Sequence, residues 1–249
     1  MKKLFLVIFL GLGSQCGWSQ GGDPIGKTFE VTCQYEGEEN FRRIGMKDLP
    51  AKGEYHYDAY LPMTYEGRSQ DLFPVLFVMM PGGNARLDKY ISMLEKTECI
   101  GIALKEAKNG DYGPIMGNFL AAHDEAMTRF RIDPERKFAT GFSGGARGSS
   151  LFTQMREGFA GLILQGAAYW FDDKTNLYSY EKSPKGIRVY LLVGKEDKNN
   201  TENERMKKEM PKRVKYKIEL IEGGHKPSPE EKVMEALEWV MQKGEEAVN

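Results

Sequence analysis

Cysteine, histidine and an excess of charge of either sign are all scarce in this sequence of 249 residues. The chain holds three cysteines and three histidines, and its 35 Lys and Arg nearly balance its 36 Asp and Glu, so the formal net charge is -1. This balance argues against a general binder of nucleic acid, which needs a basic excess or a basic stripe. The cysteine, histidine and carboxylate residues do not have the spacing of metal ligands, so no metal site is expected.

Internal repeats and heptad arrays are also lacking, and this excludes fibrous and solenoid architectures. Hydrophobic residues make up 41% and charged residues 29% of the chain, which is the composition of a globular protein and not of a disordered one. At this length one α/β domain can bury a full core. We therefore expect residues 20–249 to form a single domain.

Long apolar runs are limited to the start of the chain, where two lysines precede the segment from Leu4 to Leu12. At about nine residues this segment is too short to span a bilayer. Gly17 and Ser19 supply small residues before a cut after Ser19, so residues 1–19 are predicted to be a signal peptide. The mature protein would then be exported, extracellular or periplasmic, without stable membrane insertion. Cys16 leaves lipid anchoring as a second option, although the three residues before it make a poor attachment sequence.

Removal of that segment would leave two cysteines, Cys33 and Cys99. In an exported protein the two could form one disulfide bond. Two cysteines make no disulfide framework, however, and their spacing matches no metal motif. We therefore favour two small apolar side chains that lie in or beside strands.

Segments with the patterns of strands and helices alternate along the rest of the chain. Strands are predicted at 28–34, 55–61, 75–80, 99–104, 137–142, 161–164, 189–193 and 214–221, and helices at 87–94, 115–130, 146–156, 202–209 and 229–242. The strand at 75–80 reads VLFVMM, and such a continuous apolar run is typical of a strand that is covered on both faces. The alternation predicts an α/β fold with a mainly parallel sheet and helices on both faces.

The pentapeptide Gly141-Phe142-Ser143-Gly144-Gly145 has the form G-x-S-x-G, with a predicted strand before it and a predicted helix after it. In a strand–turn–helix elbow the serine sits on a strained turn that small neighbours permit. The N–H of Gly144 then lies at a helix N-terminus, where it can stabilise an oxyanion. By itself the pentapeptide also fits a glycine-rich turn with an inert serine. In this context it predicts Ser143 as a nucleophile.

A serine nucleophile needs a general base, because its hydroxyl reacts poorly at its ordinary pKa. His56 lies inside a predicted strand and His123 in the middle of a predicted helix, so both are interpreted as structural. His225 lies between two glycines and a lysine–proline pair, just after the last predicted strand. Open α/β sheets place functional residues on loops of this kind. His225 is therefore the predicted base.

The base in turn needs a carboxylate that fixes its tautomer. Asp197 follows the predicted strand at 189–193, and the order Ser…Asp…His along the chain is that of α/β hydrolases. Glu196 is the alternative acid, and Asp172 and Asp173 are weaker alternatives after the preceding strand.

A second donor to an oxyanion is expected from the loop after the third strand. There the sequence reads Pro81-Gly82-Gly83-Asn84, and its glycines let the backbone approach a substrate closely. We predict that Gly83 and Gly144 together form the oxyanion hole.

With these motifs the sequence resembles the secreted single-domain α/β-hydrolase esterases that are grouped with polyhydroxybutyrate depolymerases, feruloyl esterases and dienelactone-hydrolase-like proteins. The resemblance covers about residues 54 to 243. It rests on the motifs Tyr57-Asp58-Ala59-Tyr60-Leu61-Pro62, Pro81-Gly82-Gly83, Asp133-Pro134-Glu135-Arg136, Gly141-Phe142-Ser143-Gly144-Gly145, Gly194-Lys195-Glu196-Asp197 and Gly224-His225. The family usually has His-Gly where this chain has Pro81-Gly82, which affects the oxyanion loop and not the triad. The resemblance implies ester hydrolysis through Ser143, Asp197 and His225, with no metal or organic cofactor.

The substrate side of the site depends on the short stretch between the strands at 161–164 and 189–193. It leaves no room for a large lid domain, so the site is expected to be open. Tyr169 and Trp170 lie in this stretch, where they could bind rings of a substrate or could simply pack the insertion. The expected substrate is a small-molecule or polysaccharide-linked ester with a short acyl or hydroxycinnamoyl group. A serine peptidase of the same fold and an inactive binding module on a hydrolase scaffold are the alternatives.

Overall fold

The structure, a computed structural model, describes residues 22–37, 49–172 and 177–242 of the chain. The predicted signal peptide and Cys16 lie outside these residues. Eight strands form one sheet. They are β1 (Thr28–Tyr35), β2 (Gly53–Tyr60), β3 (Phe73–Met79), β4 (Ile100–Leu104), β5 (Ile132–Phe142), β6 (Phe159–Gln165), β9 (Arg188–Gly194) and β10 (Lys215–Ile221).

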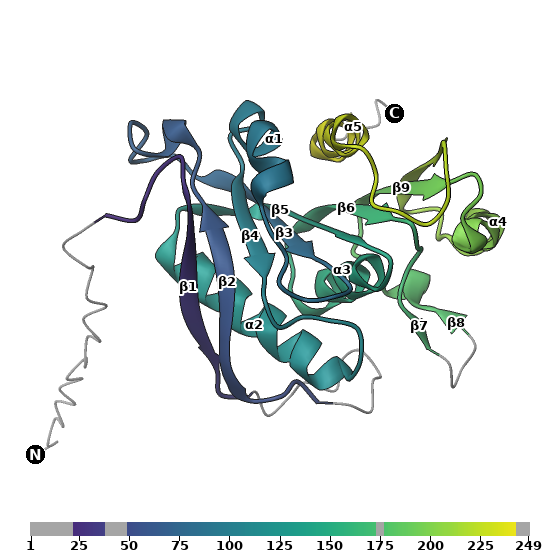
Figure 1. Cartoon of the computed structure of the whole chain (residues 1–249), viewed down its shortest axis with the longest axis horizontal. Helices are drawn as coiled ribbons and strands as arrows, with labels where there is room; N and C mark the ends of the chain where they lie inside the picture. The colour runs from purple at the N-terminus through teal and green to yellow at the C-terminus, as the bar shows by residue number, and fades with distance from the viewer. Residues whose placement is uncertain (1–21, 38–48, 173–176, 243–249) are drawn as a thin grey trace, which may run out of the picture.

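The strand order in this sheet is β1-β2-β4-β3-β5-β6-β9-β10 (Figure 1). Strand β2 pairs antiparallel with both β1 and β4, and every other pair of neighbours runs parallel. The predicted mainly parallel sheet is therefore confirmed. Because parallel strands share one direction, the loops that follow β3, β5, β6, β9 and β10 meet at the same edge.

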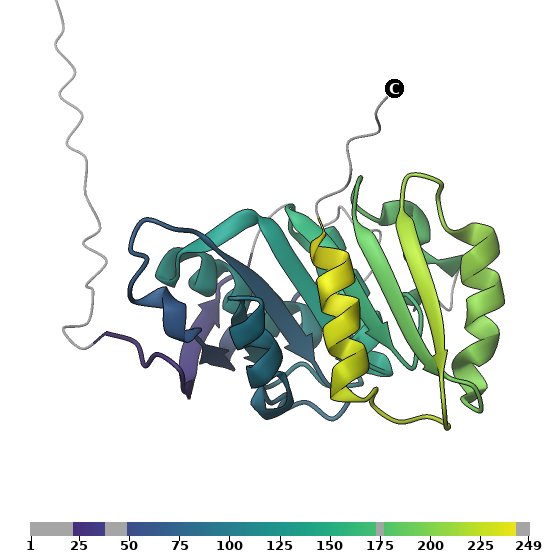
Figure 2. The same cartoon turned by 90° about the horizontal axis from the view of Figure 1, so that it is seen from above.

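Five α-helices accompany the sheet within the described residues. They are α1 (Ile91–Lys96), α2 (Tyr112–Arg129), α3 (Gly144–Met155), α4 (Glu202–Glu209) and α5 (Glu230–Met241). Buried side chains of α2 and α3 pack on one face of the sheet, and those of α1 and α5 pack on the other. Figure 2 shows α1 and the yellow α5 in front of the strands, with α2 and α3 behind them. No helix in the described part of the chain is long and apolar enough to cross a membrane.

Burial along the strands follows from this layering. All seven residues of β3 (FPVLFVM) are buried, because helices cover both faces of the sheet at its centre. Strand β1, at one edge, alternates exposed and buried residues, with its buried side chains in the core on the α2 side. Each fully buried apolar side chain in such a core contributes roughly 1.5–3 kcal/mol to folding. The apolar runs of the sequence thus place the central strands that carry the candidate site.

Two predicted boundaries differ from the structure by four residues or more. Strand β5 begins at Ile132 and not at residue 137, and its pairing with β3 shifts register before Lys137. The additional strand residues include Pro134. Proline has no N–H to donate to a neighbouring strand, so the sequence around it does not have the pattern of a strand. Helix α1 begins at Ile91 instead of residue 87, because a 3₁₀ turn, η3 (Asp88–Tyr90), precedes it. Such tight turns are common at helix N-termini.

Residues 166–187 connect β6 to β9 without a lid domain in their described part. They include the short antiparallel strands β7 (Phe171–Asp172) and β8 (Leu177–Tyr178) and the 3₁₀ turn η4 (Ser179–Lys182). This agrees with the prediction that no large lid covers the sheet edge at this point.

Cys33 and Cys99 are both buried, free thiols. Cys33 lies in β1, where its thiol donates to the backbone oxygen of Tyr55 at 3.4 Å, and Cys99 immediately precedes β4. Burial raises the pKa of Cys33 to about 12 and also raises the pKa of Cys99. A protonated, buried thiol is a poor nucleophile, so the structure agrees with two small apolar side chains.

A buried polar group lies between α2 and the sheet. His123 Nδ1 lies 2.7 Å from Asp124 Oδ1, and His123 Nε2 lies 3.1 Å from Lys137 Nζ. Lys137 and His123 are each 5% exposed. The imidazole can donate to the carboxylate and accept from the ammonium only when it is neutral. Burial lowers the pKa of His123, and the nearby charges of Lys137 and Arg156 lower it further.

We expect the contribution of His123 to the stability of the protein to be lost as the pH falls below about 6.5, the ordinary pKa of histidine. In the folded state the pKa of His123 is lowered, so the unfolded chain binds the proton more readily and acid favours unfolding. The free energy of unfolding, measured by urea titration from pH 8 to pH 5, checks this. His123→Gln keeps an acceptor for Lys137 but cannot titrate, so its stability should fall less steeply. An NMR titration midpoint for His123 at or above the ordinary value would contradict the prediction.

Candidate active site

Ser143 stands at the junction between β5 and α3, with Phe142 as the last strand residue and Gly144 as the first helical one. Its backbone has φ 55° and ψ -119°, a conformation that a non-glycine residue rarely adopts and that stores strain. The N–H of Ser143 donates to the backbone oxygen of Gln165 in β6 at 2.7 Å. The sheet therefore holds the strained turn in place.

The flanking glycines of the pentapeptide allow α3 to lie directly on the central strands. A Cβ added to Gly141 would lie 2.6 Å from the backbone oxygen of Met79 and would also overlap Gly145. A Cβ added to Gly145 would overlap the same oxygen of Met79. Neither position can hold a side chain without separating the helix from β3. The close approach explains why small residues surround Ser143.

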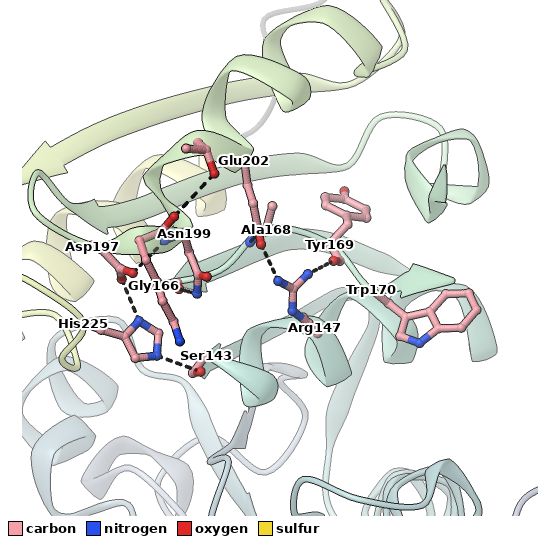
Figure 3. Close-up of polar contacts among 12 residues, drawn as sticks. Ser143, Arg147, Gly166, Ala168, Tyr169, Trp170, Asp197, Asn199, Glu202 and His225 are labelled. Carbon is pink, nitrogen blue, oxygen red and sulfur yellow. Dashed lines mark hydrogen bonds and ion pairs between the residues drawn. The ribbon is translucent and has the colours of Figure 1, made fainter. Parts of the chain in front are cut away.

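The side chains of Ser143, His225 and Asp197 form one chain of contacts (Figure 3). His225 Nε2 lies 2.9 Å from Ser143 Oγ, and His225 Nδ1 lies 2.7 Å from Asp197 Oδ2. When Nδ1–H donates to the carboxylate, Nε2 is left as the acceptor for the serine hydroxyl. The Asp197 side chain is fully buried, whereas the imidazole is 32% exposed. The arrangement can accept a proton from Ser143 and is open to solvent on the histidine side.

Asp197 follows β9 and begins a 3₁₀ turn, η5 (Lys198–Thr201). Its Oδ1 accepts the N–H of Asn199 at 2.9 Å, so each carboxylate oxygen has a partner. The Asn199 side chain donates to the backbone oxygen of Gly166 at 2.7 Å, which ties this turn to the end of β6. These bonds fix the orientation of the carboxylate toward His225.

The alternative acids differ from Asp197 in their placement. Glu196 is exposed, and its backbone N–H donates to the oxygen of Gly223 at 3.1 Å. The side chain of Asp172 and all of Asp173 lie outside the described residues. Of the described carboxylates, Asp197 is the one that contacts His225.

The loop that carries His225 is held at both ends. A Cβ added to Gly194, the last residue of β9, would lie 2.5 Å from the oxygen of Gly224, so the two loops are in direct contact. On the other side of His225, the N–H of Ser228 donates to the buried side chain of Gln165 at 3.2 Å. The glycines before His225 therefore serve a close backbone approach, in addition to forming the turn.

No protein-family model matches this sequence, and no curated protein matches it. Solved structures do match. One is similar to this chain with a TM-score of 0.59, at 13% identity over 86% of this chain and 98% of the other, and is a ferulic acid esterase. Another is an IroE-like serine hydrolase from Shewanella oneidensis, with a TM-score of 0.60, 13% identity and coverage of 86% and 80%. A third, acylaminoacyl peptidase from Pyrococcus horikoshii, has a TM-score of 0.58 and 16% identity over 89% of this chain and 43% of that longer chain.

The chain has the α/β-hydrolase fold. This confirms the fold expected from the sequence motifs. In an α/β hydrolase the loops after the parallel strands bring distant residues to one edge of the sheet, and here Ser143, Asp197 and His225 follow β5, β9 and β10 respectively.

The two glycines that were predicted to form an oxyanion hole, Gly83 and Gly144, differ in the bonding of their N–H groups. Gly144 is the first residue of α3, and the first N–H groups of a helix have no partner within it. The N–H of Gly83, in contrast, donates to the backbone oxygen of Met80 at 3.0 Å and closes a turn. The role of Gly83 stays a prediction, although an N–H that is bonded within its own turn does not face a substrate in this structure.

Tyr169 and Trp170, the two aromatic residues predicted to border the substrate site, lie in the 166–187 connection (the insertion) and are buried. Tyr169 is 0% exposed and packs against Tyr180, with its hydroxyl accepting from Ser183 Oγ at 3.0 Å. Trp170 is 7% exposed and lies edge-to-face against Tyr112. Substrate binding by these two rings stays a prediction, and in this structure both are buried. Large apolar rings on a short insertion are buried more favourably than they are exposed. Tyr169 accordingly packs within the insertion and Trp170 against the start of α2.

One ion pair beside the site could not be predicted from the sequence. Arg147, one turn after Ser143 in α3, pairs with Glu202 at the start of α4 and donates to the backbone oxygen of Tyr169 at 2.9 Å (Figure 3). The other oxygen of Glu202 accepts the N–H of Ala168 at 2.8 Å. The pair joins the helix that begins after Ser143 to the helix that follows the Asp197 turn. Helical arginine and glutamate residues are common on surfaces, which is why sequence patterns do not single them out.

Proposed function

We propose that the protein is a serine hydrolase that cleaves carboxylic esters through an acyl-enzyme intermediate. The observation that carries this proposal is the continuous line of contacts from the buried carboxylate of Asp197 through His225 to Ser143 Oγ, at 2.7 and 2.9 Å. The similarity in fold to a ferulic acid esterase supports it. We further propose that the protein acts after export, because residues 1–19 have the features of a signal peptide.

In this proposal Ser143 Oγ attacks the acyl carbon of the ester while its proton passes to His225 Nε2. The π electron pair of the carbonyl moves to its oxygen, which accepts a hydrogen bond from Gly144 N–H. When the pair reforms the carbonyl, the ester C–O bond breaks and the alcohol leaves with the proton from His225. Asp197 stabilises the imidazolium throughout. Water then attacks the acyl-enzyme in the same way and gives a proton to His225. His225 returns this proton to Ser143 Oγ as the bond to the acyl carbon breaks, and the carboxylic acid is released.

Labelling with a fluorophosphonate tests the proposal directly, since only an activated serine reacts at a useful rate. We expect one equivalent of label on Ser143 and none on the Ser143→Ala variant. A panel of p-nitrophenyl acetate, a feruloyl ester, acetylated xylan and a peptide amide then separates the reaction classes. Cleavage of the esters with no cleavage of the peptide supports an esterase. Preferred cleavage of the peptide would identify a peptidase, and failure to label would identify an inactive scaffold.

Short acyl esters are expected to be the better substrates. A long acyl chain needs a covered apolar groove. In the 166–187 connection the aromatic side chains of Tyr169, Trp170 and Tyr180 are buried and so line no such groove. The value of kcat/KM across p-nitrophenyl esters should therefore be highest at acetate or butyrate and should not rise in the presence of a lipid interface. A maximum at long chains with interfacial activation would contradict this.

The variant Trp170→Ala provides the control for that series. Because Trp170 is 7% exposed, its removal should destabilise the protein by about 3 kcal/mol and leave the order of preference among acyl chains unchanged. A shifted preference among acyl chains, in a variant of unchanged stability, would indicate that Trp170 contacts the substrate.

A further inference from the structure

The loop after β4 places an asparagine against the residue that follows the nucleophile. A Cβ added to Gly144 would overlap Asn109 Oδ1 and would lie 2.6 Å from its Cγ and 2.8 Å from its Nδ2. The carboxamide of Asn109 thus occupies the space in which any other residue after Ser143 would have its side chain. It is in contact with the same residue whose N–H is the first candidate donor to an oxyanion.

The fully buried side chain of Asn118 holds the loop that carries Asn109 in place. Asn118 Oδ1 accepts the N–H groups of Glu106 and Ala107, each at 3.0 Å, and Asn118 Nδ2 donates to the backbone oxygen of His56 at 3.1 Å. Glu106 in turn accepts from the backbone N–H and from Nδ1 of His56, each at 2.9 Å. A site built on such fixed groups loses little entropy when it binds a substrate.

Asn109 is itself joined to the oxyanion loop. Its backbone N–H donates to the oxygen of Pro81 at 2.8 Å, and the N–H of Asn84 donates to the oxygen of Lys105 at 2.6 Å. Two backbone hydrogen bonds therefore join the loops after β3 and β4. In the first of these loops the N–H of Gly83 is already bonded to Met80, which favours another group as the second donor.

We propose that the side-chain amide of Asn109 donates the second hydrogen bond to the oxyanion, beside the N–H of Gly144. A carboxamide has two N–H donors and one acceptor, and rotation by half a turn presents either end. Asn109 is exposed, and no hydrogen bond of its side chain to another described residue competes with this role. The inference rests on the proposed function. When Ser143 attacks, the carbonyl π pair moves to oxygen, and the two N–H groups stabilise that charge without transferring a proton.

The test is a kinetic and inhibitor comparison of Asn109→Ala and Asn109→Asp with the wild-type full-length protein. Loss of one such donor lowers kcat by about 10²–10³-fold, so we expect Asn109→Ala to fall in this range on p-nitrophenyl acetate, with KM changed by less than about threefold. Asn109→Asp has the same shape but no donor and should lose at least as much. Thermal stability should stay unchanged, because the side chain is exposed.

A transition-state analogue separates this role from a structural one. An alkyl trifluoromethyl ketone forms a hemiketal oxyanion with the serine, so its Ki should rise in Asn109→Ala by a factor similar to the loss of kcat/KM. Asp111→Asn, an exposed change in the same loop whose side chain makes no cap bond, should leave kcat and Ki at their wild-type values.

The outcomes distinguish this inference from the function on which it rests. If the wild type is labelled by a fluorophosphonate but Asn109→Ala keeps kcat within about threefold of it, the oxyanion role is wrong and the esterase proposal stands. A loss of kcat in Asn109→Ala with an unchanged Ki for the ketone would also show that the oxyanion role of Asn109 is wrong. If the wild type neither reacts with the label nor cleaves esters, both proposals fail.

Discussion

Replacing Ser143 with alanine is expected to lower kcat by about 10⁴-fold or more on a short p-nitrophenyl ester. The variant has no oxygen to form the acyl-enzyme, so only binding and the remaining hydrogen-bond donors act on the substrate. The protein should stay folded, because the bond from the N–H of residue 143 to Gln165 belongs to the backbone. Steady-state kinetics and circular dichroism on the same sample measure the two effects.

Ser149→Ala is the matched control for this change. Ser149 lies in the same helix, is 0% exposed, and its hydroxyl has no hydrogen-bond partner within the described part of the chain. Removal of an unpaired buried hydroxyl costs little, so this variant should keep wild-type kinetics. Residual activity of more than about 1% in Ser143→Ala would mean that another group acts as the nucleophile.

Asp197→Asn should also reduce kcat severely, by about 10³–10⁴-fold. The amide that replaces Asp197 Oδ2 can donate to His225 Nδ1, which would favour the proton on Nε2. That tautomer cannot accept the proton of Ser143, and the amide no longer stabilises the imidazolium. Because the Asp197 side chain is fully buried, bulk solvent cannot compensate for the lost charge.

Glu196→Gln provides the control for the acid, since it removes the neighbouring charge from an exposed side chain. We expect its kcat to stay within about twofold of wild type. The reverse pattern, with a severe loss in Glu196→Gln and a mild one in Asp197→Asn, would assign the acid to the neighbouring position. Determination of kcat/KM for the two variants on one substrate decides between them.

Much of the fold follows from sequence patterns that depend on few neighbours. The apolar run at β3 and the helical spacing in α2 and α5 are consequences of covering both faces of one sheet. The elbow around Ser143 is local too, because the strain of the turn and the contact between Gly141 and Gly145 involve residues within one motif, although Met79, which both glycines also approach, lies outside it. Such features can be predicted because the chain itself holds both partners close together.

The partners of a loop amide cannot be predicted in the same way. Gly83 has the residue type and position of an oxyanion donor, but whether its N–H faces a substrate or closes a turn on Met80 depends on backbone angles. Tyr169 and Trp170 have the composition of a binding rim, and their burial is decided by how the 166–187 connection folds onto α2 and α3. Composition does not distinguish these alternatives.

By itself, the sequence determined the mainly parallel sheet, the strained position of Ser143 and the order in which the candidate nucleophile, acid and base occur. The tertiary structure alone decided that Asp197 rather than Glu196 contacts His225, that Arg147 pairs with Glu202, and that Asn109 lies on Gly144. The physical reason is the range of the interactions. Periodicity and turn strain act between near neighbours in the chain, whereas these contacts join separate loops whose meeting depends on the order and twist of the strands between them.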